Sequence, residues 1–152
     1  MQIDIAKQPS IRVAAVRHTG PYTEISEAFE RMSKIAQDAD LFQPGALMLA
    51  LYHDDPQSTP AASLRSDAAI TLGDGVQAPA GSTEMTVPAG EYARATYEGP
   101  YSGLPGAWSQ VMAWVTGKGK RFADGVSYEL YRNDPTDTAP EDLITEIYVP
   151  LA

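Results

Sequence analysis

The alternation of hydrophobic and polar residues predicts three strands in the first half of the chain. Residues 11–18 (IRVAAVRH) are mainly β-branched residues and alanine, and they are followed by a Gly-Pro pair, which is typical of a strand. Two later hydrophobic runs lie at residues 46–53 (ALMLALYH) and 66–72 (SDAAITL). The Asp-Pro segment that connects these two runs is too long for a two-residue hairpin, so we expect a longer loop between two strands.

A helix is predicted between the first strand and the second. Within residues 22–39, the apolar residues Ile25, Phe29, Met32 and Ala36 follow one another at three- and four-residue spacing. This spacing gives a helix one apolar face, and the glutamate and lysine residues between them fall on the opposite face. The first half is thus expected to run strand, helix, strand, strand.

The second half of the chain repeats the first. When the sequence is aligned with itself at an offset of 79 residues, without a gap, the Gly-Pro-Tyr tripeptide at residues 20–22 coincides with the one at 99–101. The same register aligns the Asp-Pro pair at residues 55–56 with the pair at 134–135. Recurring turn residues would explain the first match but not a register that persists so far, so we infer an internal duplication.

The repeat predicts the elements of the second half. Strands are expected at residues 91–98, 126–132 and 143–151, with short additional strands at 2–5 and 84–87. The second helix is expected to bury a stripe of apolar residues formed by Leu104, Trp108, Val111, Met112 and Val115.

These elements predict an α+β fold in which two pseudo-symmetric strand-helix-strand-strand repeats form one domain over residues 1–152. The repeats are expected to span residues 1–75 and 80–152, with an antiparallel sheet, the helices on one face and a central groove. Gly-Pro ends each first strand and begins each helix, because the residue before proline avoids the α region and proline fits a first helical turn. Tyr22 is then expected at the rim where the repeats meet, either packed there or facing a ligand.

Charge and composition exclude several classes of function. The chain has 11 basic and 20 acidic residues, a net charge of -9, so its surface repels phosphate and we expect no direct nucleic-acid binding. Cysteine is absent, which removes disulfides, thiolate nucleophiles and cysteine zinc sites and fits a reducing compartment. The sequence shows no signal peptide and no apolar stretch near the roughly 18 residues that a membrane helix needs. We therefore expect a cytoplasmic protein with no membrane partner.

The remaining polar motifs predict neither a metal nor a cofactor. Asp54 and Asp55 have no further ligand at suitable spacing, and the chain contains no glycine-rich phosphate loop and no nucleophile elbow. His18 and His53 are the only histidines. A single histidine at a strand end is expected to hydrogen-bond a turn rather than to act as a base.

The two repeats differ at one chemically important position, where Glu129 replaces Ala50 of the first repeat. Because side chains alternate along a strand, Glu129 and Tyr131 share one face of their strand, and Glu146 and Tyr148 share one face of the last strand. If the hydrophobic residues between them face the helices, these four side chains lie together on the opposite face.

Two carboxylates near tyrosine and tryptophan rings would suit a cationic ligand. Each aromatic face attracts a cation by roughly 0.5–2 kcal/mol, and a carboxylate at the floor of the site adds opposite charge. Both acids have an alternative. Glu146 would be held in a salt bridge by Arg132, Arg94 or Arg65, and Glu129 would be exposed to solvent.

Three segments of the chain resemble the GyrI-like family. They are residues 52–69 (YHDDPQSTPAASLRSDAA), the Gly-Pro-Tyr after the first strand, and the segments YELYRNDP and LITEIYVPL at the end. The resemblance covers nearly the whole chain, and its most specific part is the series Asp-Asp-Pro, Thr-Pro, Leu-Arg and Asp. The family includes stand-alone DNA gyrase inhibitors and effector-binding domains joined to AraC-type and MerR-type regulators. Its fold, two strand-helix-strand-strand repeats around a groove, agrees with the duplication.

The resemblance implies a groove that binds small molecules, often apolar and cationic, between aromatic residues and a buried glutamate. By its place in the motif YELYRNDP, that glutamate corresponds to Glu129. Some members are similar in fold but hydrolyse strained cyclopropane-bearing electrophiles, with a glutamate and a tyrosine that activate water. Strand-like sequence starts at Gln2, so we expect no helix-turn-helix ahead of the domain and no role as a transcription factor.

We therefore expect a stand-alone binding domain that sequesters a small toxic or drug-like molecule, without a cofactor or a metal. The expected ligand-binding residues are Glu129, Tyr131, Tyr22, Trp108, Tyr52, Glu146 and Tyr148. Two alternatives stay open. One is a hydrolase that uses Glu129 and Tyr131 in the same groove, and the other is a modulator of DNA gyrase that acts by protein–protein contact.

Overall fold

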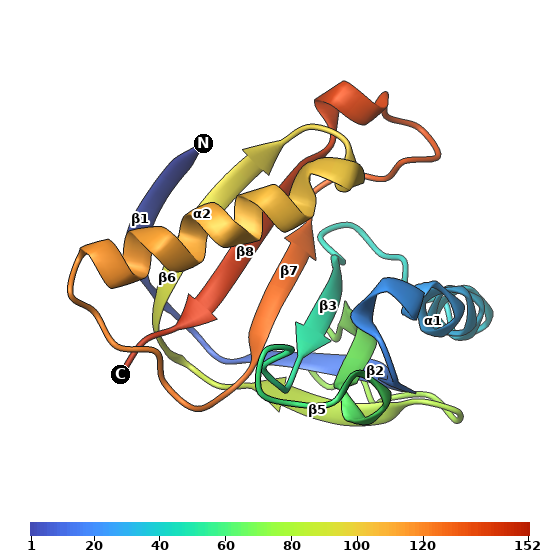
Figure 1. Cartoon of the computed structure of the whole chain (residues 1–152). Coiled ribbons are helices and arrows are strands. Elements are labelled where there is room, and N and C mark those ends of the chain that lie inside the picture. Colours follow the sequence, from blue (N-terminus) through green and yellow to red (C-terminus); the bar gives the residue numbers. More distant parts are fainter. The chain divides into compact units, whose positions relative to one another are not determined.

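The computed structural model describes all 152 residues and contains eight β strands and two α helices (Figure 1). Every pair of neighbouring strands within a unit is antiparallel, and the predicted α+β class is confirmed. The chain divides into two compact units. Unit 1 consists of Met1–Pro9 and Ala89–Ala152, and unit 2 consists of Ser10–Pro88.

Unit 2 contains four strands and one helix. Its strands, in the spatial order β3-β4-β2-β5, are β2 (Ile11–Thr19), β3 (Met48–Tyr52), β4 (Arg65–Thr71) and β5 (Thr83–Val87). Helix α1 (Ser26–Asp38) packs against β2 and β4. Its buried residues, Ala28, Met32 and Ala36, recur every four residues, as the predicted apolar face requires.

Unit 1 has the same plan. Its strands, in the order β1-β6-β8-β7, are β1 (Gln2–Gln8), β6 (Gly90–Glu98), β7 (Ser127–Tyr131) and β8 (Ile144–Pro150). Helix α2 (Leu104–Gly117) lies across the sheet of this unit (Figure 1). Val111 and Val115 of α2 pack on Ile147 and Val149 of β8 and form the core of the unit.

The internal repeat inferred from the sequence is confirmed. β6 begins 79 residues after β2 begins and ends 79 residues after β2 ends. The same offset relates β3 to β7 and β4 to β8 at both ends. The strands of the two units are therefore equivalent residue by residue, which allows any side chain in one unit to be compared with its counterpart in the other.

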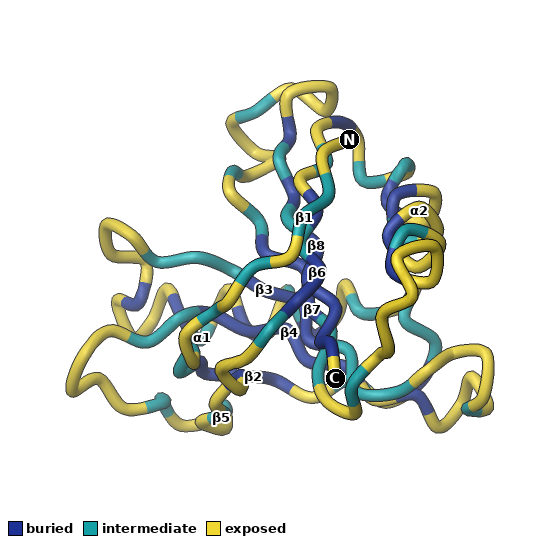
Figure 2. The backbone as a smooth tube through the Cα atoms, turned by 90° about the vertical axis from the view of Figure 1, so that its left-hand side faces the viewer, coloured by how far each residue is buried: buried dark blue, intermediate teal, exposed yellow.

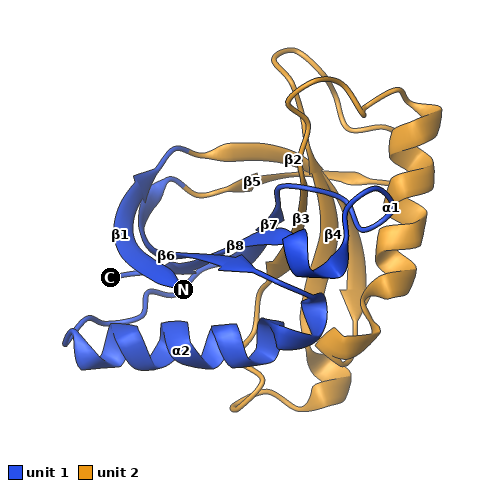
Figure 3. Cartoon of the chain, turned by 90° about the horizontal axis from the view of Figure 1, so that it is seen from above, with its two compact units in different colours: residues 1–9, 89–152 blue, residues 10–88 orange.

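The edge strands belong to the opposite unit from the one that their place in the sequence suggests (Figure 3). β1 comes just before β2 in the chain but pairs with β6, from Gln2 opposite Thr96 to Gln8 opposite Gly90. β5 comes just before β6 but pairs with β2. Each unit is thus completed by a strand from the other repeat, and the compact units differ from the expected repeats 1–75 and 80–152.

Burial is concentrated in the inner strands of each unit (Figure 2). β4 buries five consecutive residues, whereas edge strand β1 buries none. Because neighbouring residues on a strand point to opposite faces, a continuous buried run means that both faces of β4 are covered.

The repeated Gly-Pro-Tyr phrase forms the same turn in both units. The Gly20 N–H donates to Leu64 O at 2.8 Å, and the Gly99 N–H donates to Leu143 O at 2.9 Å. These glycines have φ of 131° and 150°, which residues with a Cβ rarely adopt. The strand ends before each turn and a short 3-10 segment begins at the tyrosine, so Gly-Pro separates strand from helix as predicted.

A side chain two residues before each glycine closes the same turn. His18 Nε2 lies 3.0 Å from Pro21 O, and the Tyr97 hydroxyl donates to Pro100 O at 2.7 Å. His18 therefore hydrogen-bonds a turn, as its position at a strand end predicts.

Candidate functional site

Glu129 is a buried acid in the middle of β7, with only 4% of its surface exposed. Trp108 of α2 donates its Nε1–H to Oε2 at 2.5 Å, and the Tyr131 hydroxyl donates to Oε1 at 2.6 Å. Burying a carboxylate is costly unless donors replace the water that it loses, and here each oxygen has at least one donor. The alternative in which Glu129 is exposed to solvent is therefore wrong.

Glu129 lies on the face of the sheet that α2 covers. It stands opposite Ile147 of β8, and Ile147 belongs to the core that packs beneath α2. Leu130 stands opposite Glu146, so Glu146 and its neighbour Tyr148 lie on the other face. The prediction that the two acids share one face of the sheet is therefore wrong.

The error has a physical cause, since β7 is buried on both faces. Tyr128, Glu129 and Leu130 follow one another and are all buried. Alternation along such a strand separates two sets of side chains but does not show which set faces the helix. The sequence argument placed Leu130 with Ile147 beneath the helix, whereas the structure places them on opposite faces.

Glu146 is held in a salt bridge. Arg132 donates its Nε–H to Oε2 and its Nη2–H to Oε1, each at 2.9 Å, and the Tyr148 hydroxyl donates to Oε1 at 2.6 Å. Burial acts to raise the pKa of Glu146, but the hydrogen bonds from Arg132 and Tyr148 outweigh it and hold the pKa below its ordinary value. The salt-bridge alternative for Glu146 is confirmed, with Arg132 as the partner.

Tyr148 belongs to a cluster of buried tyrosines. Its ring stacks on Tyr128 with centroids 4.6 Å apart, and Tyr92 meets both rings edge-on. Burial, together with the hydrogen bond to Glu146, raises the pKa of Tyr148 to about 12. Each of the three rings is at most 3% exposed, so Tyr148 is a packed core residue and does not lie with Glu129.

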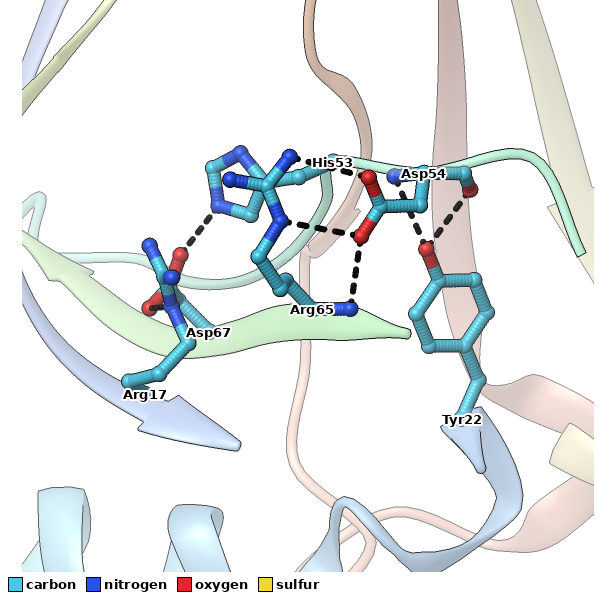
Figure 4. Close-up of polar contacts among 6 residues, drawn as sticks. All are labelled: Arg17, Tyr22, His53, Asp54, Arg65 and Asp67. Atoms are coloured by element: carbon cyan, nitrogen blue, oxygen red, sulfur yellow. Dashed lines mark hydrogen bonds and ion pairs between the residues drawn. The ribbon is translucent and has the colours of Figure 1, made fainter. Parts of the chain in front are cut away.

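Tyr22 and Tyr52 lie in unit 2, where their ring centroids are 4.8 Å apart. The Tyr22 hydroxyl donates to Asp54 O at 2.6 Å and accepts from the Asp54 N–H at 3.0 Å (Figure 4). Ala50 occupies the position on β3 that corresponds to Glu129. This corner of unit 2 therefore has aromatic rings but no carboxylate at the equivalent position.

Tyr101 is a candidate site residue that was not among the predicted ones. It is the counterpart of Tyr22, and its ring centroid lies 5.6 Å from that of Tyr131. Burial raises the pKa of Tyr101, and the negative charges of Asp134 and Glu129 raise it further. Tyr101 therefore lies within the electrostatic reach of Glu129. The duplication was the available signal, because Tyr22 is among the predicted residues.

Asp67 is a second buried acid that the sequence pattern did not reveal, in unit 2 (Figure 4). It accepts a hydrogen bond from Arg17 Nε at 2.9 Å and another from His53 Nε2. Burial acts to raise the pKa of Asp67, but the bonds from His53 and Arg17 outweigh it, so the pKa lies below its ordinary value. His53 thus pairs with an acid, and the expectation that it hydrogen-bonds a turn is wrong.

Asp67 and His53 occupy the positions in unit 2 that Glu146 and Arg132 occupy in unit 1. In each repeat, an acid on the last strand pairs with a base that follows the third strand. A pairing of an acid with a basic residue that recurs in both copies belongs to the architecture of the repeat. The counterpart of Glu129 is Ala50, so Glu129 is not part of the shared architecture and is a candidate functional residue.

Asp54 is engaged by Arg65, which donates its backbone N–H, Nε–H and Nη2–H to the carboxylate (Figure 4). These bonds lower the pKa of Asp54 to about 2.

No three His, Cys, Asp or Glu side chains gather in a way that would hold a metal ion. Neither helix has the length and hydropathy that are needed to cross a bilayer.

The arrangement around Glu129 suits a positively charged or hydrogen-bond-donating group. Trp108 and Tyr131 are neutral donors, and their two bonds orient the carboxylate. The ring of Tyr101 beside Tyr131 adds apolar surface and a π face that attracts cations. Trp108, predicted as an aromatic wall, also positions the acid.

The structure is similar in fold to several solved proteins. The C-terminal domain of EcmrR matches with a TM-score of 0.82 at 18% identity, over 99% of this chain and 97% of that one. SAV2435 bound to tetraphenylphosphonium matches with a TM-score of 0.72 at 18% identity, and the match covers 100% of this chain and 94% of SAV2435. A hydrolase encoded by lin2189 from Listeria innocua matches with a TM-score of 0.67 at 11% identity, and the match covers 99% of this chain and 92% of the hydrolase. These identities are low, so the matches establish the fold alone.

The sequence itself has named relatives. It is 30% identical to a DNA gyrase inhibitor of Yersinia enterocolitica over 136 residues, which cover 86% of this chain and 85% of the relative. Residues 1–152 match the family model described as the GyrI-like small molecule binding domain. The resemblance seen in the sequence motifs is confirmed, and the protein belongs to the family of GyrI-like small molecule binding domains.

Proposed function

We propose that the protein binds a small, largely apolar molecule with a positive charge, and that the Glu129 carboxylate is the charged contact. The observation that carries this proposal is the burial of Glu129 on the helix-covered face of unit 1, with hydrogen bonds from Trp108 and Tyr131. A bound cation would add opposite charge to a carboxylate that burial has removed from water. Packing of the repeat does not require an acid there, since the other copy has Ala50.

A similar structure supports this class of ligand. SAV2435 is described as bound to tetraphenylphosphonium, a cation whose charge is surrounded by phenyl rings. Such a cation gains from apolar burial, from π faces and from a carboxylate at the same time. We propose that this chain takes ligands of the same class and that it acts by sequestering them.

Isothermal titration calorimetry with tetraphenylphosphonium tests the proposal. We expect Glu129→Gln to weaken binding about 10-fold or more, because the amide keeps the shape of the side chain but removes its charge. Glu98→Gln is the matched control, since it removes the same charge from an exposed position on β6 and should leave binding unchanged. Equal affinity of wild type and Glu129→Gln would overturn the role of Glu129.

Hydrolysis is a second candidate function. The direct hydrogen bond between Tyr131 and Glu129 favours it, since a carboxylate in an apolar site can act as a general base. The Listeria innocua protein with a similar fold is described as a hydrolase. Mass spectrometry would follow a strained cyclopropane electrophile over time. Consumption that Glu129→Gln abolishes would support turnover, and a stable substrate would leave the protein as a binder.

Modulation of DNA gyrase is a third candidate, because the Yersinia relative is named a DNA gyrase inhibitor. Such a partner would place the protein in the cytoplasm. A supercoiling assay with purified gyrase tests this candidate. The absence of inhibition at micromolar protein would remove it.

A further inference from the structure

The two units use the tyrosine of Gly-Pro-Tyr differently. In unit 2, the Tyr22 hydroxyl donates to Asp54 O and accepts from the Asp54 N–H, so the chain itself satisfies it. In unit 1, the hydroxyl of the counterpart Tyr101 makes no hydrogen bond within the protein. A partly buried tyrosine usually finds a partner for its hydroxyl. The difference between the copies points to a partner for Tyr101 from outside the chain.

The Tyr101 hydroxyl is open to molecules from solution. The buried side-chain oxygens and nitrogens without a partner are Ser66 Oγ and Thr145 Oγ1, so the unbonded hydroxyl of Tyr101 is not buried. Its ring lies 5.6 Å from the Tyr131 ring, and Tyr131 donates to Glu129. The ring that carries the open hydroxyl is therefore linked to the Glu129 carboxylate through Tyr131.

Tyr101 is a hydrogen-bond donor at neutral pH. Burial and the charges of Asp134 and Glu129 raise the pKa of its hydroxyl above the ordinary value of 10.0. The phenol therefore keeps its proton and donates it to any acceptor within reach. An anionic acceptor at Glu129 and a neutral donor at Tyr101 are thus linked through Tyr131.

We propose that Tyr101 is a second polar contact of the Glu129 site, and that the site prefers cations that also carry an oxygen acceptor such as a carbonyl or an ether. This inference rests on the proposed function, because it takes the positive group of the ligand to lie near Glu129. The preferred ligand has an aromatic body, a positive charge and one acceptor. Cations without the acceptor still bind, but they gain nothing from the hydroxyl of Tyr101.

Calorimetry with matched phosphonium cations tests this preference. Tetraphenylphosphonium has no acceptor, whereas the 3-acetylphenyl and 4-acetylphenyl triphenylphosphonium isomers each add one carbonyl oxygen to the same body. We expect Tyr101→Phe to weaken binding of at least one acetyl isomer by roughly 3- to 10-fold, the usual effect of one hydrogen bond. The affinity of the same variant for tetraphenylphosphonium should equal that of wild type.

Tyr22→Phe is the matched control. It removes the equivalent hydroxyl from unit 2, where Asp54 already satisfies it. We expect this variant to bind the acetyl isomers and tetraphenylphosphonium in the same ratio of affinities as wild type does. Circular dichroism and thermal unfolding of both variants would show that each retains its fold.

The outcomes separate this inference from the function on which it rests. If wild type binds none of the three phosphonium cations, the proposed function and the role of Tyr101 both fail. If Glu129→Gln weakens binding as expected but Tyr101→Phe binds every cation as tightly as wild type, the role of Tyr101 alone is overturned.

Discussion

Three acidic side chains of the two units are at least partly buried, and two of them are held by arginine. Asp67 is bound by Arg17 and Glu146 by Arg132, and both partners carry a positive charge. The hydrogen bonds from Trp108 and Tyr131 to Glu129 come from neutral groups. At the scale of residues, the proposed cation site is marked by an acid that the other repeat replaces with Ala50, whereas the acids at positions 67 and 146 recur in both repeats.

The Trp108–Glu129 hydrogen bond predicts the effect of Trp108→Phe. The substitution keeps an aromatic ring on α2 but removes the Nε1–H that Glu129 accepts at 2.5 Å. Loss of a hydrogen bond to a charged group costs about 1.5–3 kcal/mol, so we expect the free energy of unfolding in urea to fall by this amount. Cation affinity should fall as well, because the carboxylate is less firmly oriented.

Trp114→Phe, on the same helix, is the control for this prediction. Trp114 contacts Lys118, whose Nζ lies 5.6 Å from the ring centroid. A cation–π contact of this kind at the surface contributes about 0.5–1 kcal/mol, so the expected loss is smaller. If the free energy of unfolding falls equally in the two variants, the hydrogen bond from Trp108 to Glu129 contributes no more than the surface contact of Trp114.

At the scale of elements, the positions of strands and helices follow from the sequence. The spacing of hydrophobic residues and the glycine and proline residues that end each element indicate the same bounds. β2 was expected at residues 11–18 and is found at Ile11–Thr19. α2 ends at Gly117, where the GKGK segment breaks the apolar pattern. β1 extends to Gln8, beyond the expected residues 2–5, because pairing with β6 imposes strand geometry on residues of low strand propensity.

The composition of the site could be predicted only in part. Glu129 is recognisable because its counterpart is Ala50, and the repeat also leads to Tyr101. The faces of β7 and β8 could not be predicted, since both strands bury successive residues. For this reason Glu146 and Tyr148 were grouped with Glu129 although a sheet separates them.

The salt bridge between Asp67 of β4 and Arg17 of β2 predicts sensitivity to acid. The pKa of Asp67 in the folded state lies below the ordinary value of 3.8. The unfolded chain therefore binds the proton first as the pH falls. The contribution of Asp67 to stability is complete above about pH 4 and is lost as the pH falls through the lower, folded-state pKa.

Asp67→Asn tests this dependence. Breaking a buried pair costs several kcal/mol, but Arg17 is 44% exposed, so we expect a loss of roughly 2 kcal/mol at pH 7. The loss should shrink at pH 3, as measured by urea unfolding at both pH values. Asp38→Asn is the control, because Asp38 is 69% exposed and its removal should change little. A loss that is the same at both pH values would contradict the assignment.

At the scale of the whole molecule, the exchanged edge strands predict the effect of removing residues 1–9. This truncation deletes β1 and, with it, the ion pair between Asp4 and Arg94. We expect the amides of β6 to lose protection in hydrogen exchange followed by mass spectrometry. The amides of β2, next to the cut in sequence, should keep theirs because β4 and β5 flank this strand. The reverse pattern would contradict the pairing.

This exchange could not be predicted from the repeat. The 79-residue register stays the same whichever unit receives β1 or β5, because the strands of the two units are equivalent. Only the pairing of backbone groups in three dimensions shows that each edge strand joins the sheet of the other repeat.

The pairing of β1 with β6 also sets an order of events during protein synthesis. All strands of unit 2 lie between Ile11 and Val87, so this unit can fold while the ribosome is still adding the second repeat. β6 is complete only when Glu98 has been added, and at roughly 5–20 residues per second this happens about 5–20 s after β1 is made. β1 is therefore made before its partner strand and stays unpaired until β6 has been translated.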